Sequence, residues 1–135
     1  MVKLIIGVKG TGKTKALISM VNEAAEKSNG NVVCIEKGVG LRFDIKPTVR
    51  LINTNEYLVF DAQALYGFVA GILASNHDVT DLFIDGALKI ANNDVAGLEA
   101  FVKAVDELTA KLDVNVVMTS SLPVEDASDL VKKYI

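Results

Sequence analysis

The chain of 135 residues has one cysteine, one histidine, two prolines and no tryptophan. A single cysteine excludes an internal disulfide and a cysteine-based zinc site, and one histidine argues against a transition-metal enzyme. The chain has 14 basic and 17 acidic residues, and its net charge of −3 argues against generic attraction to nucleic acid or anionic membranes. The longest uncharged stretch, Ala62 to His77, is shorter than the roughly 20 residues of a membrane span.

The sequence as a whole is strongly apolar. Half of the residues are hydrophobic, 23% are charged, and the mean hydropathy is +0.35. These values fit one folded domain over residues 1–135 rather than a disordered chain. They also favour a sheet buried on both faces, or an apolar patch covered by a homo-oligomer or a protein partner. The apolar run Leu4 to Ile6 is too short for a secretory signal, so we expect a cytoplasmic protein.

Short apolar runs alternate along the chain with longer stretches of helical periodicity. The predicted strands are Val2–Ile6, Val32–Ile35, Val49–Ile52, Leu82–Ile84 and Val114–Met118. The predicted helices are Thr14–Lys27, Phe60–Ser75, Asp94–Leu112 with Asn92 or Asn93 as its cap, and a short last helix from Pro123 to Lys133. Strands that alternate with helices predict an α/β fold, a three-layer αβα sandwich with a mainly parallel sheet.

The segment after the first strand carries the most specific motif. Gly7-Val8-Lys9-Gly10-Thr11-Gly12-Lys13-Thr14 matches G-x-x-x-x-G-K-[ST] at every required position. The glycines let backbone N–H groups point at phosphate oxygens, and the helix that follows adds the positive end of its dipole. Lys13 is predicted to contact the β- and γ-phosphates, and the Thr14 hydroxyl to bind Mg²⁺. We therefore predict a phosphate-binding loop.

A magnesium–nucleotide site also needs an acid at the carboxyl end of a nearby strand. Asp85 follows the apolar run Leu82 to Ile84 and is predicted to hold the metal together with Thr14. An aspartate followed by glycine is also an ordinary turn signal, so this assignment depends on the phosphate loop.

With these motifs the chain resembles the P-loop NTPase superfamily, and from Lys3 to Ser120 the order of elements is similar to a minimal RecA- or KaiC-like ATPase core. The resemblance implies that Glu36, at the end of the second strand, orients the attacking water. It also implies that Thr119 or Ser120 senses the γ-phosphate. The alternatives are a solvated acid at Glu36 and helix capping by Thr119 and Ser120. Many ATPases of the superfamily have a glutamate where this chain has Gly86.

The resulting hypothesis is a protein that binds ATP with Mg²⁺ and has weak or partner-activated ATPase activity. One alternative is a nucleotide-dependent switch or scaffold that does not hydrolyse, which Gly86 and the small number of arginines favour. The other is a small nucleoside or nucleotide kinase, for which two arginines, Arg42 and Arg50, offer little of the usual basic lid. The Asn/Thr-Lys-x-Asp signature of GTP-specific proteins is missing from Val116 to Pro123, so ATP is favoured over GTP.

Overall fold

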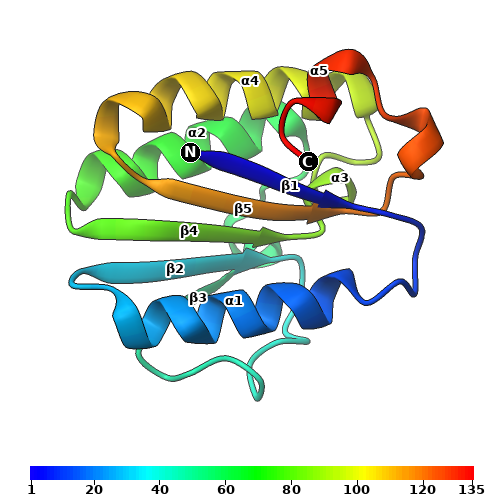
Figure 1. Ribbon diagram of the computed structural model, residues 1–135. Coiled ribbons are helices and arrows are strands. Elements are labelled where there is room, and N and C mark those ends of the chain that lie inside the picture. Colours follow the sequence, from blue (N-terminus) through cyan, green and yellow to red (C-terminus); the bar gives the residue numbers. More distant parts are fainter.

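The computed structural model describes all of residues 1–135, with one sheet of five strands between two layers of helices (Figure 1). The strands are β1 (Val2–Ile6), β2 (Asn31–Glu36), β3 (Arg50–Asn53), β4 (Val79–Asp85) and β5 (Asn115–Ser120). They lie in the order β1-β5-β4-β2-β3, and every neighbouring pair is parallel. The predicted α/β sandwich is confirmed, with a wholly parallel sheet.

The helices divide unequally between the two faces of the sheet. α1 (Lys13–Lys27) covers one face, and α2 (Ala62–Ser75) and α4 (Val95–Leu112) cover the other (Figure 1). The shorter elements are η1 (Thr54–Tyr57), α3 (Ala87–Ile90), η2 (Val124–Asp126) and α5 (Asp129–Lys132). None of these helices has both the length and the apolar composition that crossing a bilayer requires.

Each face of the sheet has its own core. The larger core of 25 buried residues lies under α2 and α4, and the smaller one of 9 residues lies under α1. Successive side chains of a strand point to opposite faces. Ile35 and Ile84 therefore belong to the larger core, whereas their neighbours Cys34 and Phe83 face α1. This alternation also fixes the face to which the polar residues at the strand ends belong.

The start of α4 differs from the prediction. Asp94 is the cap, because its Oδ1 accepts the N–H of Gly97 at 3.0 Å, and the helix begins at Val95. Asn92 and Asn93 have left-handed backbones, with φ of 58° and 59°, and form the turn that precedes the cap. The predicted capping by Asn92 or Asn93 was therefore wrong, since the aspartate one residue later is the one in reach of the first turn.

The last predicted helix is also interrupted. A 3₁₀ turn ends at Asp126, Ala127 is extended, and α5 begins after Ser128, whose Oγ accepts the N–H of Val131 at 3.2 Å. Ala127 and Val131 are both buried in the larger core. A continuous helix from Pro123 was therefore wrong, because the break at Ala127 lets both side chains reach that core.

Candidate functional site

The phosphate loop connects β1 to the start of α1. Gly12, at the cap of α1, has a φ of 84°, and a Cβ added at Gly7 would lie 2.8 Å from Thr11 Oγ1, so both positions favour glycine. Lys13 Nζ donates to the carbonyl oxygen of Val8 at 2.8 Å, and Thr11 Oγ1 donates to the same oxygen at 2.8 Å. These bonds hold the loop in a tight curl.

The first turn of α1 is open to an anion. No side chain caps this helix, and its first turn holds no acidic residue. The free N–H groups at the start of a helix attract negative charge, as does the positive end of the helix dipole. The start of α1 therefore keeps the two features on which the sequence-based prediction of a phosphate-binding loop rests, free backbone N–H groups and the positive end of a helix dipole.

The predicted metal ligands lie together. Thr14 Oγ1 is 3.1 Å from Asp85 Oδ1 and 3.3 Å from Asp85 Oδ2, although the two residues are 71 positions apart in the sequence. Thr119 Oγ1 donates to Asp85 Oδ1 at 2.9 Å and accepts the N–H of Gly86 at 2.8 Å. Asp85 is thus fixed from two sides, by the first turn of α1 and by the end of β5.

A cavity of about 580 Å³ opens between the phosphate loop, the end of β4 and the turn after α3. Four lysines and one carboxylate, that of Asp85, line it, and only one of its 13 lining residues is hydrophobic. Neither of the two salt bridges in the structure involves any of these lysines. The lysines are Lys9, Lys13, Lys15 and Lys89. Four positive charges against one negative charge leave an excess of three in a chain whose net charge is −3.

Most of the site residues predicted from the sequence line this cavity. They are Lys9, Gly10, Gly12, Lys13, Thr14, Asp85 and Thr119. Gly7, Val8 and Thr11 shape the loop without lining the cavity. Sequence reasoning missed Lys15, Gly86, Leu88, Lys89, Asn93 and Ser121, which do line it. The available signal for Lys89 was its position, one helical turn after Asp85.

Thr119 and Ser120 lie on opposite faces of the sheet. Thr119 lies on the same face as Asp85, whereas Ser120 points to the larger core, as does Met118 two residues before it. The Ser120 side chain is fully buried and its hydroxyl has no hydrogen-bond partner. Of the two predicted γ-phosphate contacts, the structure therefore brings only Thr119 to the cavity.

Glu36 pairs with Asp85 in the register between β2 and β4, so the two carboxylates end neighbouring strands on the same face. The Glu36 side chain is buried, and both of its carboxylate oxygens accept the N–H of Leu41, at 3.3 and 3.2 Å. Burial raises the pKa of Glu36, the Leu41 N–H lowers it, and the charge of Asp85 raises it further. Glu36 does not line the lysine-rich cavity.

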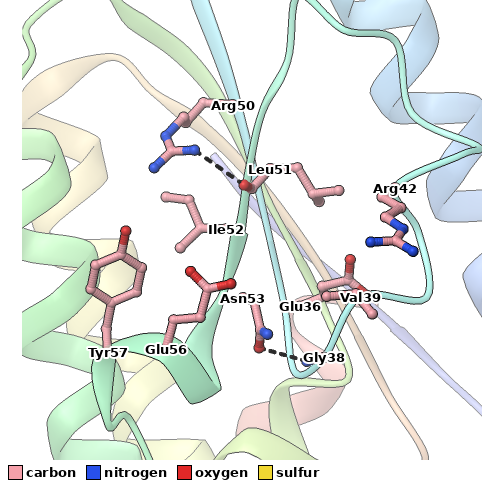
Figure 2. A pocket seen from close by; sticks show the side chains of 10 residues that line it. All are labelled: Glu36, Gly38, Val39, Arg42, Arg50, Leu51, Ile52, Asn53, Glu56 and Tyr57. Carbon is pink, nitrogen blue, oxygen red and sulfur yellow. Dashed lines mark hydrogen bonds between the residues drawn. The ribbon is translucent and has the colours of Figure 1, made fainter.

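Instead, Glu36 lines a second cavity of about 200 Å³ between the loop after β2 and the end of β3 (Figure 2). The N–H of Gly38 donates to Asn53 Oδ1 at 2.8 Å and joins the two walls. Arg42 and Arg50, the two arginines of the chain, line this cavity from opposite sides (Figure 2). Neither forms a salt bridge.

Comparison with solved structures finds the same fold in proteins of low sequence identity. A KaiC-like protein from the hyperthermophilic archaeon Pyrococcus horikoshii OT3 matches with a TM-score of 0.70 and 15% identity, over 98% of this chain and 66% of that one. The pCW3 conjugation coupling protein TcpA, in its monomer form with ATPγS, matches with a TM-score of 0.56 and 12% identity, over 99% of this chain and 46% of that one. No family model and no curated protein matches the sequence.

These similarities and the wholly parallel sheet show a RecA-like α/β fold. The chain spans just under two thirds of the length of the KaiC-like protein and less than half that of TcpA. At these identities and coverages the comparisons show the fold alone.

Proposed function

We propose that the protein binds ATP with Mg²⁺ and hydrolyses it slowly unless a partner or a second copy completes the site. The observation that carries this proposal is the contact of Thr14 with Asp85 at 3.1 and 3.3 Å, beside the open start of α1. The excess positive charge of the adjoining cavity suits a polyphosphate. ATP rather than GTP is proposed because the chain lacks the GTP signature.

The donors around Asp85 fit a magnesium ion. Mg²⁺ takes oxygen ligands and is usually held by one or two carboxylates, with water and phosphate oxygens completing its shell. A hydroxyl and a carboxylate meet here, and no cluster of three or more acidic, histidine or cysteine side chains offers an all-protein metal cage. When bound, Mg²⁺ would neutralise charge on the β- and γ-phosphates.

In hydrolysis Lys13 would offset the charge that develops on the γ-phosphate, and Glu36 would orient the water. Glu36 is proposed on its register with Asp85, and its carboxylate has to leave the Leu41 N–H to reach that water. No arginine lines the lysine-rich cavity. Because a positive group supplied by a partner contributes on the order of 10³–10⁵ in rate in related systems, turnover by one copy should be slow.

The test is ATP turnover measured against protein concentration, on the wild type and on Glu36→Gln. We expect the turnover number to rise with concentration if copies complete each other's sites, and the variant to bind ATP without hydrolysing it. Unchanged turnover in Glu36→Gln would eliminate the role of Glu36 in catalysis.

A switch that binds ATP without hydrolysing it is the second candidate. The engagement of Glu36 by Leu41, and its place in the second cavity, favour this candidate. Tight ATP binding with no turnover at any protein concentration would select it over the ATPase.

A further inference from the structure

Lys89 is a cation of the lysine-rich cavity that does not come from the phosphate loop or its helix. It lies on α3, the single helical turn that follows Asp85 and Gly86. The N–H of Ile90 donates to the carbonyl oxygen of Gly86 at 3.0 Å, which closes this turn. Lys89 therefore stands one helical turn beyond the metal-binding acid.

The turn that carries Lys89 is fixed from both sides. Its neighbours Ala87, Leu88 and Ile90 are all buried, so Lys89 is the exposed residue of α3. On the other side, the N–H of Gly86 donates to Thr119 Oγ1, which itself donates to Asp85. The backbone that carries Lys89 is therefore held at a fixed position relative to Asp85.

The lysines of the cavity divide into two groups. Lys9, Lys13 and Lys15 belong to the phosphate loop and the first turn of α1, which is the side of the cavity proposed for the phosphate chain. Lys89 comes from the side of Asp85, and no carboxylate lies within salt-bridge distance of it. In P-loop proteins the metal ion neutralises charge on the β- and γ-phosphates, so a cation beside the proposed metal ligand Asp85 would lie near the terminal end of the phosphate chain.

We propose that Lys89 binds the terminal phosphate of the bound nucleotide and so makes the site prefer a triphosphate over a diphosphate. This rests on the proposed function, because it assigns a further residue to the same nucleotide site. Lys89 would supply from the chain itself part of the positive charge that a partner's group would otherwise bring. A lysine suits this contact because its ammonium group can donate to more than one phosphate oxygen.

The test measures dissociation constants for ADP and for the non-hydrolysable triphosphate AMP-PNP, both with Mg²⁺, by calorimetry. Lys89→Ala is compared with the wild type, with Lys89→Arg, which keeps the charge, and with Lys103→Ala, an exposed lysine of α4 outside the cavity. A charge-assisted hydrogen bond corresponds to roughly a tenfold to hundredfold change in affinity. Lys89→Ala should weaken AMP-PNP binding by that factor and leave ADP binding within about twofold of the wild type.

The outcomes separate this inference from the proposed function. Equal weakening for both nucleotides, or none for either, in a Lys89→Ala protein that unfolds at the wild-type temperature would overturn the role of Lys89 and leave the nucleotide site standing. A wild type that binds neither nucleotide would overturn both. Recovery of AMP-PNP affinity in Lys89→Arg, with Lys103→Ala unchanged, would support a contact made by the charge.

Discussion

The Thr14 hydroxyl, in the first turn of α1, lies 3.1 Å from Oδ1 and 3.3 Å from Oδ2 of Asp85, at the end of β4. The strand that leads into α1 is β1, and β5 lies between β1 and β4 in the sheet. Neither the strand order nor local periodicity therefore requires this contact. At the start of α1 the fold thus brings together a hydroxyl and a carboxylate, the two groups to which the proposed function assigns the magnesium ion.

Thr14→Val should remove the effect of magnesium on nucleotide binding. Valine keeps the shape of the side chain and lacks the hydroxyl that would bind the ion. We expect ATP affinity in EDTA to match that of the wild type, while the gain on adding Mg²⁺ falls about tenfold or more. Thr14→Ser, which retains the hydroxyl, is the control. An undiminished magnesium effect in Thr14→Val would contradict the metal assignment.

Thr119→Val should weaken the support of Asp85 and destabilise the fold. The hydroxyl of Thr119 donates to Asp85 and accepts the N–H of Gly86, so valine leaves that N–H without a partner. A fully buried donor without a partner costs about 1–3 kcal/mol, and the part-buried N–H of Gly86 should cost about 1 kcal/mol, at the lower end of that range. Urea denaturation measures this loss, and Thr119→Ser should retain most of the wild-type free energy of unfolding. A Thr119→Val protein as stable as the wild type would show that the two bonds contribute little.

Glu36 should make the protein less stable as pH rises. Burial raises the pKa of its carboxyl above the ordinary value of 4.5, so the folded state keeps the proton at pH values where the unfolded state has lost it. The free energy of unfolding therefore falls as pH increases above about 4.5. Glu36→Gln cannot titrate and lacks this contribution. Denaturation at several pH values should show the stability of the wild type, relative to this variant, decreasing from pH 4 to pH 7. A constant difference would refute the shift.

Cys34 should resist alkylation in the folded protein. It is fully buried in the smaller core, and burial raises the pKa of its thiol to about 12, helped by the charges of Asp85 and Glu36. Since the thiolate is the reactive form, iodoacetamide at pH 8 should label Cys34 only as urea unfolds the chain. Rapid labelling of the native protein would show that β2 opens to solvent.

Much of this arrangement could be predicted from the sequence, because its signals are local. The phosphate loop is a contiguous motif, and Asp85 follows an apolar run. The order of parallel strands has no such signal, since apolar strands buried on both faces carry no alternation that would assign their neighbours. Two features of the site depend on this order and on α3. One is that Thr119 faces the cavity while Ser120 faces the larger core, and the other is that Lys89 lines the cavity. They could be read only from the structure.

The most direct test of the central claim is the thermal unfolding shift caused by Mg²⁺ with ATP, on the wild type and on Lys13→Ala. A ligand at 100 times its dissociation constant stabilises the folded state by about 2.7 kcal/mol, a shift of several degrees for a domain of this size. We predict that shift for the wild type and its loss in Lys13→Ala. No shift in the wild type at millimolar ATP, or an equal shift in Lys13→Ala, would contradict a nucleotide site at the phosphate loop.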